Sequence, residues 1–425
     1  MNKKKLAYRG GLPVCNSIEP FNTIDSKELN AVKKVMEKGK LSGFFANRNN
    51  GFLGGEKVRE FEKNICDFFD VKYAIAVNSW TSGLQICVGA IDIQPGDEVI
   101  VSPWTMCATV SSIVSWLGIP VFADIDPNTL TICPEAIERK ITKKTKAIMT
   151  VDIHGLSSDM KTIKKIAKKH KLKIICDTAQ APAAKYNNKF AGTLGDIGGF
   201  SLNYHKHIHT GEGGVIVTNS SKLAQRSRLI RNHAEVIVQQ TDNLSNMIGG
   251  NYRMGEIEAA IGIEQLKKLN KIFNSRKKIA DSVKKVLNKF DFINIPPTPK
   301  NQTHSYYMIP ILYDSEKTGV SRKKLVLALQ AEGLNDIIYE GFSLVHMLPM
   351  FQKKIGFGKS GYPWKKPIAN RDNYDYSVGI CPVAEDYYSN KFIGFCNCMI
   401  RGSNDDIKKI EQIFFKVLSQ IEELK

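Results

Sequence analysis

The sequence predicts an α/β protein: a mostly parallel β-sheet sandwiched by helices, followed by a smaller C-terminal α+β domain. Between residues 56 and 218, short β-branched segments alternate with segments of helical periodicity, a pattern typical of parallel sheets that are covered on both faces. Further along, a Pro-rich break at residues 295–300 cannot continue a helix. We therefore predict a large α/β domain at residues 1–275, including an N-terminal arm, and a small domain at residues 276–425.

Each predicted strand is a short apolar run next to turn residues. The run at 98–102, for example, follows a Gln-Pro-Gly-Asp turn at 94–97. The predicted strands cover residues 73–77, 98–102, 120–125, 146–152, 173–177, 196–202, 214–218 and 306–312.

Predicted helices carry apolar residues three or four positions apart. Within residues 56–69, Phe61, Ile65 and Phe68 fall on one face. A long Gly- and Pro-bearing loop at 341–368 exceeds a typical connection and is a candidate substrate lid. The other predicted helices cover residues 81–91, 106–117, a segment starting near Pro134, 159–170, 256–290, 321–332 and 404–424.

Composition excludes several classes of protein. Of the 425 residues, 43% are hydrophobic and 24% are charged, which excludes a disordered, collagenous or coiled-coil chain. The net charge of +18 would suit nucleic acid, a membrane surface or an anionic substrate. The Lys tract at 161–173 also contains Ile163, Ile166 and Ala167, so we interpret it as the solvated face of a helix and predict no nucleic-acid binding.

Cysteine usage and the N-terminus predict a cytoplasmic location. The nine Cys include no C-x-x-C pair, and most lie in apolar segments, where a free thiol behaves as a small hydrophobe. No apolar segment follows the basic N-terminus, and no stretch approaches the roughly 18 apolar residues of a membrane helix. We expect no membrane insertion.

Three polar segments follow predicted strands, where open parallel sheets bind ligands. Residues 78–83 open a helix, and their hydroxyl and N–H groups could hold a phosphate, although an ordinary N-cap would look similar. Asp177 ends an apolar strand. An Asp at such a position is commonly only the cap of the following helix. Lys206 stands on a loop between two strands, five positions after Ser201.

The loop around Lys206 has two other interpretations. His205, His207 and His209 alternate, and on an extended strand they would project to the same side, as in a metal site. No Asp or Cys stands nearby at ligand spacing, so we predict no metal. The Gly-rich turn after Lys206 also lacks the order of a nucleotide-binding G-x-x-x-x-G-K-[ST] loop.

Together the three segments have the chemistry of a pyridoxal phosphate site. A partly desolvated lysine amine forms Schiff bases. A carboxylate holds the pyridine nitrogen protonated, and a hydroxyl-rich helix start binds the phosphate. Lys206, Asp177 and residues 78–83 would supply these groups.

The sequence resembles the DegT-type sugar aminotransferases, which have the aspartate aminotransferase fold, fold type I. The resemblance runs from Gly54 to Glu385, and its strongest pieces are residues 78–84, 120–126, 177–180, 201–214 and 251–260. It implies a pyridoxal 5'-phosphate cofactor and a homodimer with a shared active site.

The resemblance also implies roles for individual residues. Lys206 would bind the cofactor covalently and transfer the proton, and Asp177 would pair with the pyridine nitrogen. Gln180 would lie against the phenolic oxygen of the ring. The phosphate would be held by Ser201, Trp80 and Thr81 of the same chain and by Asn251, which reaches the neighbouring subunit.

Two positions depart from the family pattern. Met106 stands where many members have an aromatic residue that stacks on the cofactor, with Trp104 two residues earlier. Trp80 replaces the Gly of the usual Asn-Ser-Gly-Thr run. On the substrate side we expect His346, with Trp104 and Arg253 as further candidates.

The predicted activity is transfer of an amino group from an amino acid, glutamate in most of the family, to a keto sugar. The sugar would be nucleotide-activated, and the pathway would make amino sugars or a surface polysaccharide such as lipopolysaccharide. The alternatives are a pyridoxal phosphate-dependent sugar dehydratase or epimerase, and an aminotransferase acting on a keto-inositol or keto-octulosonate. Outside enzymes, the alternative is a sensor that binds the cofactor.

Overall fold

The computed structural model describes residues 5–45, 50–234, 247–339, 341 and 343–425, and it confirms a mostly parallel central sheet. The sheet has seven strands in the order β1-β9-β8-β5-β4-β2-β3. β9 pairs antiparallel with β1 and β8, and the other neighbours are parallel. The strands are β1 Tyr73–Val77, β2 Glu98–Val101, β3 Ile119–Phe122, β4 Thr145–Val151, β5 Lys173–Asp177, β8 Ile197–Ser201 and β9 Gly214–Thr218.

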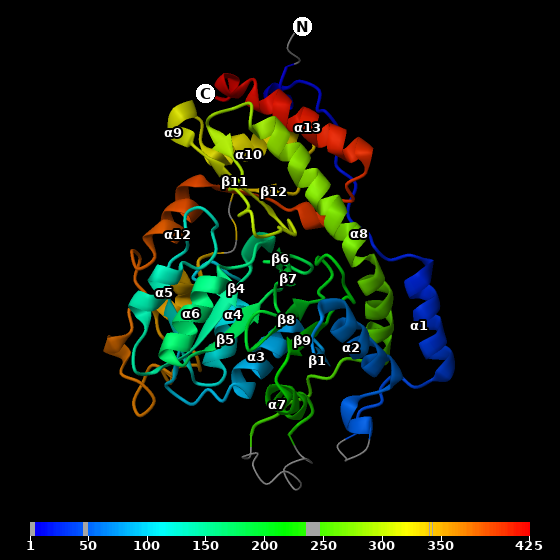
Figure 1. Ribbon diagram of the computed structural model, residues 1–425. Helices are drawn as coiled ribbons and strands as arrows, with labels where there is room; N and C mark the ends of the chain where they lie inside the picture. Colours follow the sequence, from blue (N-terminus) through cyan, green and yellow to red (C-terminus); the bar gives the residue numbers. More distant parts are fainter. Residues whose placement is uncertain (1–4, 46–49, 235–246, 340, 342) are drawn as a thin grey trace.

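Helices cover both faces of this sheet (Figure 1). On β1, Ile75 and Val77 face a core shared with α3, α4 and α7, whereas Ala74 and Ala76 face α2 and α8. The helices are α2 Glu56–Phe69, α3 Trp80–Ala90, α4 Cys107–Val114, α5 Pro134–Lys140, α6 Met160–His170, α7 Ser221–Arg231 and α8 Glu256–Leu287. Among the described residues, no helix combines the length and apolarity needed to cross a bilayer.

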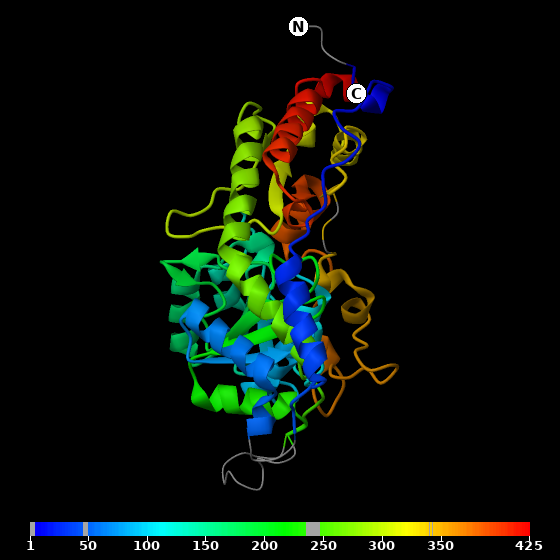
Figure 2. The same ribbon diagram turned by 90° about the vertical axis from the view of Figure 1, so that its right-hand side faces the viewer.

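The C-terminal region forms a second sheet, with four antiparallel strands in the order β10-β11-β13-β12. Its core includes the end of α8 and residues Leu6 and Ile18 of the N-terminal arm. α8 runs unbroken through residue 275 and spans both regions (Figure 2). The elements are β10 Ile293–Asn294, β11 Ile309–Tyr313, α9 Ser315–Thr318, α10 Arg322–Ala331, β12 Ile337–Ile338, α11 Pro349–Gln352, α12 Pro382–Asp386, β13 Phe392–Phe395 and α13 Asn404–Leu418.

Some elements differ from the predicted ones. The strand predicted at 306–312 begins only at Ile309, because Tyr306 adopts a positive φ of 50° in the preceding turn. The helix predicted at 404–424 ends at Leu418, and a separate 3-10 turn follows. The prediction omits α7, β12, β13 and α1 (Ser26–Lys38), although a capping box of Asp25 and Glu28 marks the start of α1.

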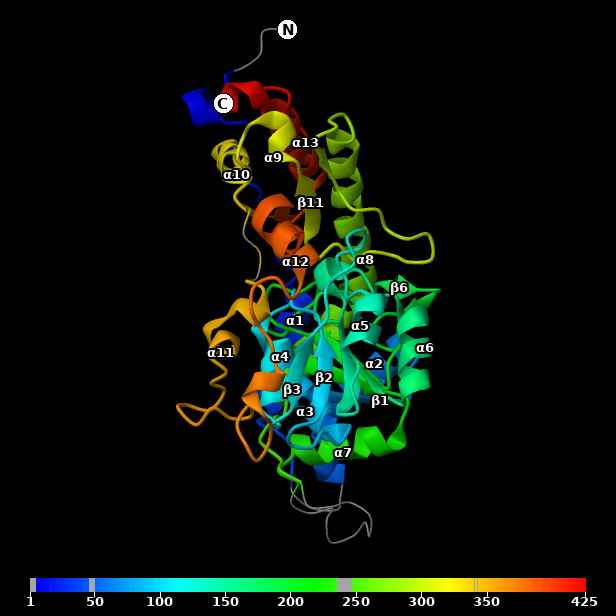
Figure 3. The ribbon, with the colours of Figure 1, turned by 90° about the vertical axis from the view of Figure 1, so that its left-hand side faces the viewer.

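The segment predicted as a candidate lid, of which residue 342 lies outside the described residues, packs against the large domain. Its Phe351 and Trp364 and the nearby Tyr376 are buried and pack edge to face. The Tyr376 hydroxyl donates to the carbonyl of Pro120 in β3, at 2.8 Å. This part of the chain therefore covers the outer edge of the sheet (Figure 3), and a role as a lid stays a prediction.

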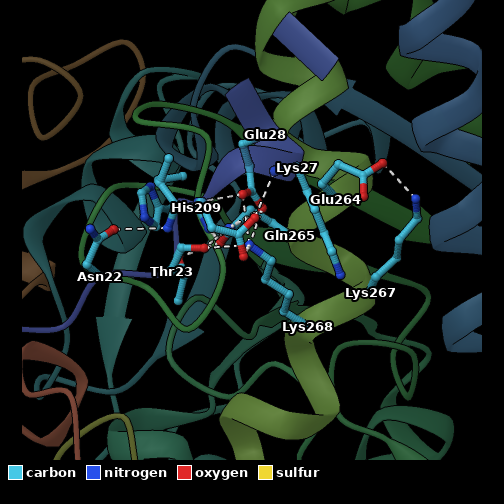
Figure 4. A network of polar contacts seen from close by, with 11 residues as sticks. Asn22, Thr23, Lys27, Glu28, His209, Glu264, Gln265, Lys267 and Lys268 are labelled. Carbon is cyan, nitrogen blue, oxygen red and sulfur yellow. Dashed lines mark hydrogen bonds and ion pairs between the residues drawn. The ribbon is translucent and has the colours of Figure 1, made fainter. Parts of the chain in front are cut away.

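A polar network ties the N-terminal arm to α8 (Figure 4). Lys268 Nζ donates to Glu28 Oε2 at 2.8 Å and to Asp25 Oδ2 at 2.9 Å. Gln265 Nε2 donates to Glu28 Oε1 at 2.8 Å, while its Oε1 accepts from Thr23 Oγ1 at 2.7 Å. Because Glu28 and Gln265 are buried, this network holds α1 against the long helix.

Replacing Lys268 by Met is expected to lower the free energy of unfolding by about 3 kcal/mol, because the buried Glu28 carboxylate loses its cationic partner. Lys267→Met is the matched control: that lysine is 61% exposed, and we expect its loss to cost less than about 0.5 kcal/mol. Urea unfolding followed by circular dichroism measures both. Equal effects of the two substitutions would contradict a stabilising role for the buried ion pair between Lys268 and Glu28.

Candidate active site

Four strands of the central sheet, β1, β4, β5 and β8, end at one cavity of about 320 Å³. These strands run in the same direction, so the segments that follow them meet at one edge of the sheet. Three larger clefts, of about 850, 900 and 470 Å³, have no buried lysine among the described residues that line them. Seven predicted residues line the smaller cavity: Trp80, Thr81, Met106, Asp177, Gln180, Ser201 and Lys206.

Asp177 is the last residue of β5, and it is only 4% exposed. Its Oδ1 accepts hydrogen bonds from Trp80 Nε1 at 2.8 Å and from the Ala179 amide at 3.2 Å. Its Oδ2 accepts from Thr109 Oγ1 at 2.7 Å. These three donors hold the carboxylate in one orientation at the cavity.

Lys206 lies on the turn after β8 and is 6% exposed. Its Nζ lies 4.5 Å from the centre of the Tyr307 ring. Burial lowers the pKa of Lys206 to about 8, although Cys398 and Asp177 oppose the shift. The neutral, nucleophilic form of this amine is therefore more populated near neutral pH than in an exposed lysine.

The hydroxyl groups predicted at the helix start lie at the rim of the same cavity. Ser79 caps α3 by accepting from the Ser82 amide at 3.1 Å. Thr81 lies in the first turn of α3, whose leading N–H groups have no partner within the helix. Ser201 ends β8 and lines the cavity with them. Such an arrangement suits a phosphate dianion.

Gln180 is held in place by residues far away in the sequence. Its side-chain Oε1 accepts from the His154 amide at 2.7 Å, and its backbone carbonyl accepts from Ser305 Oγ at 3.0 Å. The backbone carbonyl of Ser305 accepts a hydrogen bond from His207 Nε2 at 2.8 Å. The turn that precedes β11 therefore positions both Gln180 and the residue next to Lys206.

Several cavity residues are missing from the predicted site. Asp152 directly follows β4, and its place at the end of the predicted strand 146–152 was the signal that could have revealed it. Burial is the main reason that the pKa of Asp152 is raised, to about 7. Thr105 and Thr109 reach the cavity from the α4 region, and only the orientation of that helix shows it.

Four predicted residues do not line the cavity of this chain. Trp104 is fully buried and packs edge-on against His154. His346 is fully buried, and its Nε2 pairs with Glu385 at 3.0 Å. Asn251 is exposed and accepts from Arg253 Nε at 2.8 Å. The roles of Trp104, His346, Asn251 and Arg253 remain predictions.

The three alternating histidines have different surroundings. His205 lines the cavity, and burial followed by the Lys206 charge lowers its pKa to about 4. His207 is buried against Ser305. The backbone amide of His209 donates to Gln265 Oε1 at 3.4 Å. The loop is irregular, so the side-chain alternation of an extended strand does not apply to these residues.

Comparison with known proteins identifies the family to which this chain belongs. Residues 23–371 match the model of the DegT/DnrJ/EryC1/StrS aminotransferase family. The chain belongs to this family. It is therefore a pyridoxal 5'-phosphate-dependent aminotransferase with the fold-type I architecture.

Individual relatives cover most of the chain. The spore coat polysaccharide biosynthesis protein SpsC of Bacillus subtilis is 32% identical over 349 residues, 80% of this chain and 86% of SpsC. GDP-perosamine synthase of Escherichia coli O157:H7 is 34% identical over 349 residues, 79% of this chain and 92% of that enzyme. The structure of an aminotransferase from Psychrobacter cryohalolentis, 28% identical, gives a TM-score of 0.81 and covers 95% of this chain and 99% of its own.

The residues of the cavity fit the family's cofactor. The buried amine of Lys206 would hold its aldehyde carbon, and the carboxylate of Asp177 would face its pyridine nitrogen. The hydroxyls of Thr81 and Ser201, with the first amides of α3, would hold its phosphate. The donor set thus offers one complementary group for each polar part of pyridoxal 5'-phosphate.

In the cofactor-free protein, covalent attachment of pyridoxal 5'-phosphate is expected to accelerate as pH rises, with a midpoint of about 8. The neutral amine reacts, and burial is what lowers the pKa of Lys206, so protonation removes the nucleophile below that midpoint. Stopped-flow absorbance between pH 6 and 10 measures the rate. A midpoint near 10.4, the usual value for an exposed lysine, would contradict the buried setting.

Proposed function

We propose that this aminotransferase moves an amino group from glutamate to the keto group of a nucleotide-linked sugar, in the biosynthesis of a surface polysaccharide such as lipopolysaccharide. The observation that carries the proposal is the buried Lys206 and Asp177 in one cavity. The chain is 34% identical to a GDP-perosamine synthase, whose name describes a nucleotide-linked amino sugar, and SpsC is named for a polysaccharide. These names support the proposed acceptor class.

Lys206 is proposed to carry the proton. The bound cofactor supplies an electron sink for the carbanion that forms when the donor Cα loses its proton. With its pKa lowered by burial to about 8, the Lys206 amine is a suitable base near neutral pH. The same side chain, once protonated, would deliver the proton to the former aldehyde carbon of the cofactor.

Asp177 and the helix start are proposed to hold the two ends of the cofactor. The Asp177 carboxylate stabilises positive charge on the pyridine nitrogen, and this charge makes the ring a better electron sink. Thr81 and Ser201 anchor the phosphate, and Gln180 contacts the ring oxygen. Each of these side chains lines the cavity, and this shared location supports the assignment.

We also propose a cytoplasmic homodimer with a shared active site. All nine cysteines are free, as expected in a reducing compartment. Asn251 is exposed and lies outside the cavity of its own chain, a position that suits a contact with a second copy. The division into domains 1–275 and 276–425 is part of the same proposal.

Nitrogen-15 glutamate and a panel of acceptors test the function. The panel contains keto sugars linked to GDP, UDP and dTDP, together with a keto-inositol and a keto-octulosonate. The expected result is incorporation of the label into one nucleotide-linked sugar, detected by mass spectrometry. Labelling of the inositol or octulosonate instead, or loss of water without gain of nitrogen, would overturn the proposed acceptor or reaction.

A further inference from the structure

The side chain of Trp80 lies in a space that two glycines leave open. Trp80 begins α3 and is 5% exposed. A Cβ atom at Gly199 in β8 would lie 2.5 Å from the indole ring, and one at Gly83 would lie 2.6 Å from it. A Cβ at Gly214 in β9 would approach the Trp80 backbone to 2.8 Å. The indole therefore packs closely between β8 and its own helix, while β9 packs against the Trp80 backbone.

The indole N–H of Trp80 points at Asp177. The distance from Trp80 Nε1 to Asp177 Oδ1 is 2.8 Å, and both residues are buried. The other carboxylate oxygen accepts from Thr109 Oγ1 at 2.7 Å, and Thr109 in turn contacts Thr105 Oγ1 at 2.7 Å. With side-chain donors on both oxygens, the plane of the carboxylate is fixed.

We infer that Trp80 is a positioning residue for Asp177: its indole N–H orients the buried carboxylate and stabilises it as an anion for the pyridine nitrogen of the cofactor. This inference rests on the proposed role of Asp177. It assigns the Trp80 side chain to the ring end of the cofactor, whereas the sequence led us to expect it at the phosphate.

Hydrogen bonds from neutral donors to a buried carboxylate are among the stronger ones in proteins. Loss of the indole donor would leave Oδ1 with only the longer bond from the Ala179 amide. Trp80→Phe removes the N–H and keeps an aromatic ring in the glycine-lined space. Trp116→Phe is the matched control, because Trp116 Nε1 donates to the carbonyl of Gln85, at 2.8 Å, outside the cavity.

The first measurement is the equilibrium binding of pyridoxal 5'-phosphate to the cofactor-free protein, followed by absorbance. We expect Trp80→Phe to raise the dissociation constant about tenfold to hundredfold, and Trp116→Phe to leave it unchanged. A melting curve of each variant reports whether it folds. Wild-type affinity in a folded Trp80→Phe protein would overturn the inference.

The second measurement changes Asp177 and observes the indole N–H of Trp80. The chain has four Trp, so a nitrogen-15 NMR spectrum of the cofactor-free protein contains few indole signals, and the Trp80→Phe spectrum identifies the one from Trp80. In Asp177→Asn this signal is expected to move upfield, because a neutral acceptor forms a weaker bond, while Asp67→Asn leaves it in place. An unchanged signal in Asp177→Asn would overturn the inference even if the enzyme proves to use another substrate.

Discussion

Lys206→Ala is expected to reduce kcat for amino transfer by on the order of 10⁴-fold, because one side chain serves both as the covalent anchor and as the proton carrier. The cavity is otherwise preserved, since Asp177, Ser201 and Thr81 do not depend on the lysine for their contacts. The cofactor should therefore still bind, without a covalent link. Borohydride reduction followed by intact-protein mass spectrometry distinguishes linked from unlinked cofactor.

Lys169→Ala is the matched control for that substitution. Lys169 is an exposed residue of α6 that pairs with Glu138, and its removal should change kcat less than about twofold. If Lys206→Ala retained wild-type turnover, or if borohydride still fixed the cofactor to the same peptide, Lys206 would not be the catalytic lysine.

The second largest effect is expected from Asp177→Asn. Asn has nearly the same shape and still offers an oxygen to Trp80 or Thr109, but it carries no negative charge. Loss of this preorganised charge should lower kcat on the order of 10²–10³-fold, with a smaller change in KM for the sugar. Steady-state kinetics with saturating cofactor measure both constants.

Asp67→Asn controls for the removal of a carboxylate elsewhere. Asp67 is exposed on α2 and pairs only with Lys63 among the described contacts, so its kinetics should match those of the wild type. A kcat for Asp177→Asn within a few fold of that value would show that the ring nitrogen does not depend on this carboxylate.

The central sheet was predictable because its signals are local. Apolar runs such as residues 73–77 and 173–177 match β1 and β5 in both bounds, and helix 56–69 matches α2. Parallel strands bring their carboxyl ends to one edge. That rule predicts that Lys206 and Asp177 lie in one site, and both line the same cavity.

The remaining parts of the site depend on contacts between distant segments. Thr109 donates to Asp177 across 68 positions in sequence, and nothing in the residues of α4 indicates which face turns toward the cavity. The Trp80 ring packs against Gly199, which belongs to β8 and lies far away in the sequence. Short strands such as β12 have only two residues, too few for a periodic pattern.

The most direct test of the account is a half-reaction with the purified holoenzyme and glutamate alone. Transamination predicts that the visible absorbance of the lysine-linked cofactor disappears, that one equivalent of 2-oxoglutarate is formed per active site, and that the absorbance returns when the keto-sugar acceptor is added. Absorbance that does not respond to glutamate or any other amino donor, with no keto acid formed, would contradict the account.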